Sequence, residues 1–179
     1  MHANKVILGA LALLVTAAAG FAAGTANSQE AAKSPLSAEH KWLASLAGDY
    51  TVKVSGMMGE SDGTHRIESK LGGLWSVSHF ESKMMGQPFQ GLEVMGFDPL
   101  KKKFVSIWVD SMNPLMTTLE GTYDADTKTL TMRGLSRGMD GEKAEMVNTT
   151  KFRDGGMVFS MNIEGTPGPL MTIDYNQKK

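Results

Sequence analysis

Residues Leu71–Met112 read LGGLWSVSHFESKMMGQPFQGLEVMGFDPLKKKFVSIWVDSM, and this stretch decides the fold. Its side chains alternate with the two-residue period of a β-strand. Gly-Gly, Met-Gly-Gln-Pro and Asp-Pro-Leu-Lys interrupt it at short intervals, and these are typical turn sequences. The same pattern continues to the end of the chain, with no helical segment between the strands. The sequence therefore predicts an all-β protein, a single antiparallel meander β-barrel of about ten strands.

The N-terminal part of the chain predicts export. Residues 1–26 combine a short basic start, an uncharged apolar run and several small residues, which is the layout of a secretory signal peptide. The run is shorter than the about 20 apolar residues of a spanning helix, so we expect no stable membrane span after signal cleavage; the alternative is an N-terminal anchor. Residues 27–36 predict a flexible tether. Residues 37–179 predict the β-barrel domain, and a short helix that either Ser34-Pro35 or Ser37 could start precedes its strands.

Composition narrows the location and the partners. The chain has no cysteine, so it can form no disulfide and carries no lipobox, and we expect a periplasmic or secreted protein. Its net charge of −1 becomes −2 without the signal peptide, because Lys5 is the only charged residue before Glu30. The one basic run, residues 101–103, is predicted to be a solvated hairpin tip. We therefore expect no nucleic-acid partner.

One predicted strand, Phe104–Ser111, is apolar on both faces. An antiparallel strand with one face in water normally alternates apolar and polar residues. We therefore expect its outer face to be covered, either by the N-terminal helix or by a second subunit. The second case predicts a homo-oligomer formed through this strand.

Three segments carry a resemblance to a known family. They are HKWLASLAGDYTVKV (40–54), residues 71–112 with the blocks MMGQPF-x-G and GFDP-x-KKK-F-x-x-x-W-x-DSM, and LEGTYDADTKTLTM (119–132). Over residues 40–175 the chain resembles the secreted bacterial proteins of the domain of unknown function 1579 family. The resemblance implies a lipocalin-like barrel of calycin type, with Gly48-Asp49-Tyr50 in place of the Gly-x-Trp of calycins. That family has no established activity, so the resemblance implies no catalytic residue.

Aromatic and titratable residues alternate on two predicted strand faces. Trp75, His79 and Glu81 share one face, and Trp108 and Asp110 share another. If both faces point into the barrel, the two tryptophans would pack against a ligand, and the polar residues would bind its polar end, with His79 as a partner for Glu81. If they point outward, the polar residues are solvated. We expect non-catalytic binding of a small apolar or amphipathic ligand at these five residues.

Two other functions stay open as hypotheses. The first is an oligomeric interaction or structural protein of the cell envelope. The second is a copper binder that uses thioether and imidazole ligands from Met57-Met58, Met84-Met85, His65 and His79. Gly134–Gly138 matches the G-x-S-x-G pattern, but a hairpin context does not fit a nucleophile elbow. We therefore predict no catalytic residue, no resident metal and no cofactor.

Overall fold

The computed structural model describes residues 36–57, 59–137 and 143–179. The predicted signal peptide and almost all of the predicted tether lie outside these residues and stay predictions. Within the described ranges, no helix is long and apolar enough to cross a membrane.

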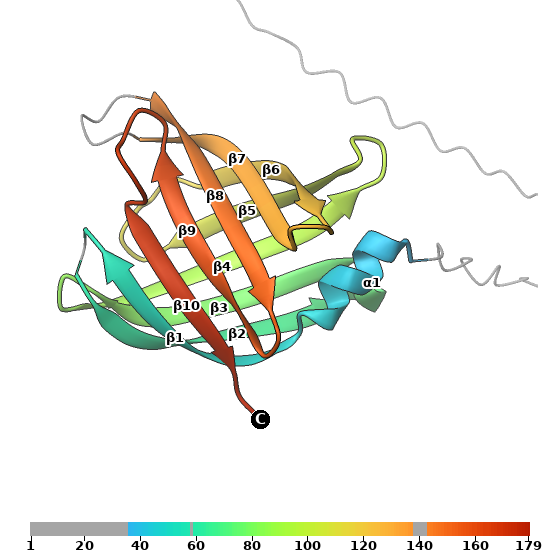
Figure 1. Cartoon of the computed structure of the whole chain (residues 1–179), viewed down its shortest axis with the longest axis horizontal. Helices are drawn as coiled ribbons and strands as arrows, with labels where there is room; N and C mark the ends of the chain where they lie inside the picture. The colour runs from blue at the N-terminus through green and yellow to red at the C-terminus, as the bar shows by residue number, and fades with distance from the viewer. Residues whose placement is uncertain (1–35, 58, 138–142) are drawn as a thin grey trace, which may run out of the picture. The chain divides into compact units, whose positions relative to one another are not determined.

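Ten antiparallel strands close into one barrel (Figure 1). Each strand pairs with its neighbours in the sequence, and β10 pairs with β1 to complete the circle. The strands are β1 (Gly48–Gly56), β2 (Ser61–Lys70), β3 (Trp75–Met84), β4 (Gln87–Asp98), β5 (Lys103–Asp110), β6 (Thr117–Asp124), β7 (Thr129–Arg137), β8 (Lys143–Arg153), β9 (Gly156–Ile163) and β10 (Met171–Gln177). This order confirms the predicted meander barrel of about ten strands.

Two glycine-containing segments whose composition predicts turns, Ser61-Asp62-Gly63 and the stretch that begins at Gly134, belong to strands instead. Residues 61–63 open β2, and residues 134–137 end β7. The physical reason is close contact between strands: a Cβ on Gly63 would lie 2.2 Å from the carbonyl oxygen of Glu81, and one on Gly134 would lie 2.2 Å from that of Thr118. These glycines therefore allow neighbouring backbones to approach. The G-x-S-x-G segment up to Arg137 thus lies on a strand, and Gly138 lies outside the described residues.

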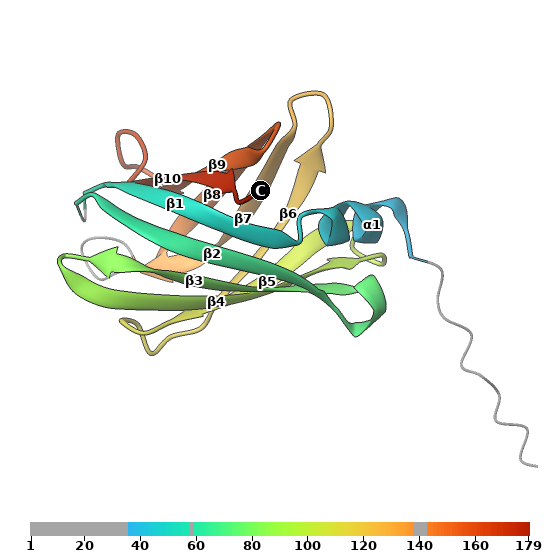
Figure 2. The ribbon, with the colours of Figure 1, turned by 90° about the horizontal axis from the view of Figure 1, so that it is seen from below.

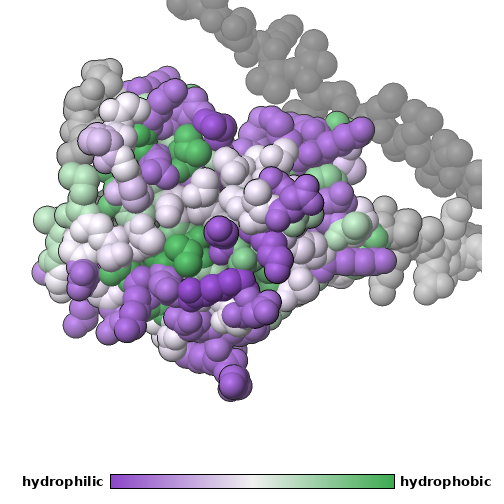
Figure 3. Space-filling model, viewed as in Figure 1, coloured by the Kyte–Doolittle hydropathy of each residue, from purple (hydrophilic) through white to green (hydrophobic). Residues whose placement is uncertain are grey.

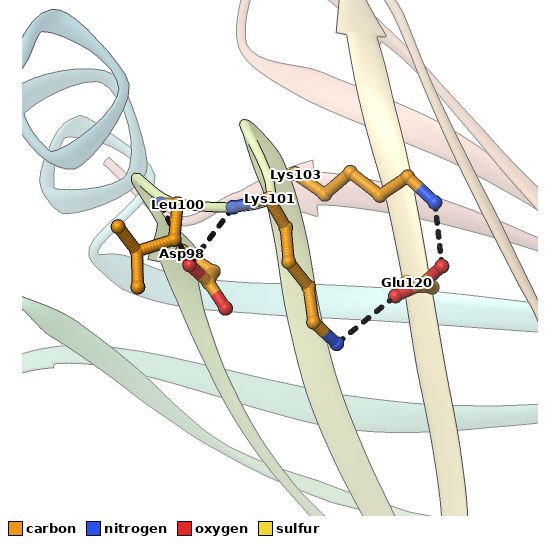
Figure 4. Close-up of polar contacts among 5 residues, drawn as sticks. All are labelled: Asp98, Leu100, Lys101, Lys103 and Glu120. Atoms are coloured by element: carbon orange, nitrogen blue, oxygen red, sulfur yellow. Dashed lines mark hydrogen bonds and ion pairs between the residues drawn. The ribbon is translucent and has the colours of Figure 1, made fainter.

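The turn between β4 and β5 shows how the basic run is accommodated (Figure 4). The Asp98 carboxylate accepts hydrogen bonds from the backbone amides of Leu100 and Lys101, at 2.9 and 3.1 Å. The ammonium groups of Lys101 and Lys103 both pair with Glu120 on β6. Local Asp-to-amide bonding therefore forms the turn, and Lys101 lies at an exposed hairpin tip as predicted.

The single α-helix of the described chain, α1 (Ala38–Ser45), lies at one end of the barrel (Figure 2). Of the two predicted starts, Ser37 is the one that caps the helix, and it accepts a hydrogen bond from the His40 amide at 3.4 Å. Leu43 is only 2% exposed and packs with a cluster of inward side chains that includes Phe104. Trp42 stacks on Tyr123 of β6 with ring centroids 4.3 Å apart. The helix therefore closes an end of the barrel and leaves the outer face of β5 uncovered.

Inward and outward side chains alternate along every strand, as the pleat requires. The wall formed by β1 and β10 is apolar inside, where Val52 and Ile173 are buried, and polar outside, where Lys53 and Asp174 lie. Figure 3, which shows the molecule from the side of β8–β10 in Figure 1, has hydrophilic residues around that face and hydrophobic residues only in small separate areas.

Candidate functional site

The barrel encloses a cavity of about 520 Å³. Leu43 of α1 and Leu46, the C-cap of this helix, line the cavity at one end, and Met112 and Asn113 of the loop between β5 and β6 also line it. The rest of the lining comes from inward side chains of β2 to β10, most of them apolar. This volume is in the range of small-molecule sites, which are typically apolar with a few well-placed polar groups.

Three aromatic rings form one wall of the cavity. Phe89 stacks on Trp108 with ring centroids 6.4 Å apart and planes at 22°, and Phe80 meets Trp108 edge-on at 6.4 Å. Gly91 on β4, which pairs with Asp110, makes room for the indole, since a Cβ there would lie 2.2 Å from two of its ring carbons. The wall therefore offers a preformed aromatic surface to a bound molecule.

Asp110 holds this wall in place. Its Oδ2 accepts a 3.0 Å hydrogen bond from the Trp108 indole nitrogen. Its Oδ1 accepts hydrogen bonds from the backbone amides of Met112 and Asn113, at 2.9 and 2.8 Å. Asp110 therefore orients the indole and forms the loop beside the cavity, which makes it a positioning residue.

Polar groups face the same space from several strands. Glu93 of β4 lies directly between Ser78 of β3 and Trp108 of β5 in the sheet register. Three buried side-chain atoms of cavity-lining residues make no hydrogen bond: His65 Nδ1, Ser78 Oγ and Asn148 Oδ1. Each such atom costs about 1–3 kcal/mol relative to a satisfied one. A polar group of a bound molecule would satisfy part of this set.

Burial shifts the pKa values of the titratable groups in the cavity. It raises the pKa of Glu93 to about 6, against a partly offsetting effect of the nearby Ser106 hydroxyl. It lowers the pKa of His65 to about 4, helped by the charge of His79, so the imidazole is neutral at physiological pH. Burial and the Glu93 charge raise the pKa of Tyr175, which keeps its phenol protonated. The cavity therefore contains neutral donors and one carboxyl group that titrates near neutrality.

The structure places the five site residues predicted from the sequence on two different faces of the barrel wall. Trp108 and Asp110 line the cavity. Trp75, His79 and Glu81 lie on the outer face of β3, because Ser76, Ser78 and Phe80 occupy its inward positions. The two predicted faces therefore do not meet, and ligand binding by any of the five stays a prediction.

On the outer face, His79 and Glu81 make no hydrogen bond to each other. Glu81 instead accepts a 3.3 Å hydrogen bond from Gln90 on β4. Trp75 is 38% exposed and lies over Gly96, where a Cβ would be 2.6 Å from its ring. These three residues therefore have roles on the barrel surface.

Sequence reasoning missed the polar residues of the interior. Glu93 and Asn148, which face the cavity, were not singled out from the sequence, and His65, which was named only as a possible copper ligand, faces it too. For Glu93 the flanking residues are Leu92 and Val94, whose outward positions are apolar, so the strand gives no polar face to recognise. The usable signal was the single charge among the alternating inward residues Phe89 to Phe97.

The outer face of β3 to β5 is apolar and forms a shallow groove. Val77, Val94 and Ile107 are paired in one row across the three strands, and Trp75 and Val105 flank Gly96 in the next. Ile107 is 37% exposed. The groove continues to Leu135 on β7, and Lys70, Lys101, Glu120 and Arg133 contribute to its lining. The predicted two-sided apolar character of β5 is therefore real, and within the described residues nothing covers it.

The residues of the copper hypothesis are separated by the barrel wall. His65 points inward and His79 outward, and Met84 is buried while Met85 is exposed. Met57 is exposed, and Met58 lies outside the described residues. Within the described ranges, no three His, Asp or Glu side chains lie close enough to hold a metal ion.

The chain belongs to the family described as Protein of unknown function (DUF1579), whose model matches residues 35–177. The matched range contains α1 and all ten strands. It confirms the family resemblance seen in the sequence. The search of curated proteins found no match for this chain.

Proposed function

We propose that this protein is an exported, lipocalin-like barrel that binds a small apolar or amphipathic molecule in its interior without transforming it. One observation carries the proposal: the cavity of about 520 Å³ joins an apolar, aromatic wall to buried polar atoms that lack partners. A purely structural core would fill such a space, because voids cost stability. The export signal predicted in residues 1–26 would place this binding site outside the cytoplasm.

The apolar part of the ligand would lie against Trp108, Phe80 and Phe89, and its polar end near Glu93 and Ser78. Desolvating apolar surface stabilises a complex by about 25 cal/mol per Å² before the costs of association. The polar groups add less affinity and more specificity, since a ligand that leaves them unpaired is rejected.

Titration with a neutral fluorescent probe, N-phenyl-1-naphthylamine, tests the proposal. We expect saturable binding that apolar competitors displace. Ser78→Phe fills the cavity and should abolish binding, whereas Val77→Phe, the adjacent outward position, should leave it unchanged. Absence of displaceable binding to the wild-type protein, or equal effects of the two variants, would contradict an interior site.

The apolar groove supports a second candidate function, association of two copies of this chain through the outer faces of β3 to β5. A closed barrel has no free sheet edge, so copies can associate only face to face. Charges beside the groove are already paired within the chain: Lys70 with Glu68, and Arg133 with Glu145. An isologous contact would therefore bring no uncompensated like charges together.

Sedimentation of the wild-type protein over a range of concentrations tests this second candidate. We expect a dimer that Ile107→Lys converts to a monomer, because the new charge would be buried in the contact. Thr172→Lys, on the outer face of β10, is the matched control and should remain dimeric. A wild-type monomer at high concentration excludes the homo-oligomer.

A further inference from the structure

Glu93 occupies an unusual place in the cavity wall. It lies in the middle of β4, where it is paired with Ser78 on β3 and with Trp108 on β5, and its side chain faces the cavity. The Ser106 hydroxyl is near its carboxyl group, yet Ser106 Oγ makes no hydrogen bond. Burying a carboxylate costs free energy unless it is paired with a cation or a hydrogen-bond donor, so a partner of this kind would stabilise Glu93.

No cationic side chain supplies that partner. The residues that line the cavity in the described chain include no lysine or arginine. On the neighbouring strand β5, Lys103 lies outside and pairs with Glu120, and on β2, beyond β3, Arg66 lies outside and pairs with Asp49. The cavity therefore has negative charge with no fixed positive charge to balance it.

The other titratable groups of the cavity do not change this balance. Asp110 on β5 uses both carboxylate oxygens on the indole of Trp108 and on two backbone amides. His65 on β2 is neutral above about pH 4, and Tyr175 on β10 keeps its proton. The cavity-lining residues of β3 and β6 to β9 in the described chain carry no charge. Glu93 is thus the acidic group that is left to bind a ligand.

Resting on the interior binding site proposed above, we propose that the barrel selects amphipathic amines, with the ligand ammonium on the Glu93 carboxylate and its apolar part against Trp108, Phe80 and Phe89. An ammonium has three donors and no acceptor, and Ser78, which is paired with Glu93 across the sheet, has an unpartnered Oγ in the same cavity. Aromatic faces also attract a cation. Together these contacts offset the desolvation of the ammonium.

Charge decides between ligands that are alike in shape. A carboxylate of the same length would meet Glu93 with like charge, and an alcohol would make only a neutral contact. Because burial raises the pKa of Glu93 to about 6, the amine should lose affinity as pH falls through that value. The alcohol, which needs no charge on Glu93, should not.

Calorimetric titration of the mature barrel with octylamine, octanol and octanoate tests the inference at about pH 8 and about pH 5. At the higher pH we expect octylamine to bind at least about tenfold more tightly than octanol, and octanoate most weakly. Glu93→Gln should abolish the preference for the amine while leaving octanol binding intact. Glu81→Gln, an outward carboxylate on the neighbouring strand, is the matched control and should behave as the wild type.

The outcomes separate this inference from the function on which it rests. Equal binding of the three ligands, or tightest binding of octanoate, overturns the selection of amines while the interior site stands. If none of the three ligands binds but the neutral naphthylamine probe does, the selection of amines is likewise overturned and the interior site stands. Failure of every ligand and of the probe overturns the interior site itself. If Glu93→Gln fails to fold, the wild-type loss of amine affinity at about pH 5 decides, and an unchanged affinity overturns the inference.

Discussion

Two walls of the barrel differ in which face carries their apolar side chains. In the wall of β1 and β10, apolar residues such as Val52 and Ile173 point inward and polar ones outward. In the middle of β3 to β5 the order is reversed, with Ser78 and Glu93 inside and Val94 outside. The first pattern stabilises a barrel by burial alone. The second lowers stability and is therefore expected where the protein binds something on one or both faces.

The largest expected effect appears when the same change, isoleucine to alanine, is made in each of the two walls. Ile173→Ala removes a side chain that is 4% exposed inside the β10 wall, and should lower the free energy of unfolding by about 2–5 kcal/mol. Ile107→Ala removes the same atoms from the outer face of β5, and at concentrations where the protein is a monomer it should cost less than about 1 kcal/mol. Urea denaturation measures both. Equal losses would mean that the outer face of β5 is covered in the native protein, as in a dimer.

The second expected effect concerns His65, where β2 joins the two walls. Its ring lies 5.2 Å from that of Tyr175 and 5.9 Å from that of Phe80. Its pKa is lowered to about 4 in the folded chain, so its contribution to stability is complete above the unfolded value of 6.5 and is lost as pH falls toward 4. The loss should amount to about 3 kcal/mol.

Denaturation curves of His65→Phe between about pH 7 and about pH 4 test this expectation. The variant should lack the acid-dependent loss, because its ring needs no deprotonation to be buried. His79→Phe alters a histidine of the outer face and should keep most of the loss, because burial is the larger cause of the lowered His65 pKa and the charge of His79 the smaller. A wild-type stability that does not decline over this range would contradict a buried neutral His65.

Glu93 should show the opposite pH dependence with a smaller amplitude. Its folded pKa of about 6 lies above the ordinary 4.5, so the folded chain binds the proton more tightly, and stability declines as pH rises from 4.5 to 6. At pH values above 6, the charged Glu93 lowers the free energy of unfolding by about 2 kcal/mol. Glu93→Gln should therefore unfold at higher urea concentration than the wild type at about pH 8, with the difference vanishing at about pH 4. A constant difference would mean that the carboxyl group is not buried in its charged form.

The sequence predicted the number and order of the strands because each hairpin is encoded locally. Turn residues and the two-residue period are read from neighbouring positions, as in residues 98–103 between β4 and β5. Two glycines misled that reading. Gly63 and Gly134 serve close contacts with the adjacent strands β3 and β6, and these contacts involve residues outside the segment in which a turn sequence is recognised.

The site was harder to predict because strand orientation depends on register. A one-residue shift turns every side chain to the other face. In β5, Phe104 and Trp108 were grouped correctly on one face. Because Ile107 on the other face is also apolar, hydrophobicity did not decide which of the two faces points inward. In β3 the large residues Trp75 and His79 suggested an inward face, whereas the small serines face the cavity. Hydrophobicity alone could not reveal a wall whose polarity is reversed.

The smallest expected effect tests that reversal at a single hydroxyl. Ser78 Oγ is buried beside Glu93 without a hydrogen bond, so Ser78→Ala should raise the free energy of unfolding by about 1 kcal/mol. Ser55→Ala removes the same hydroxyl from the exposed outer face of β1 and should change it little. If Ser78→Ala instead lowers stability, the hydroxyl already has a partner in the empty barrel, such as a bound water. The reversed polarity of this wall would then serve internal hydration, and ligand recognition would rest on Glu93 alone.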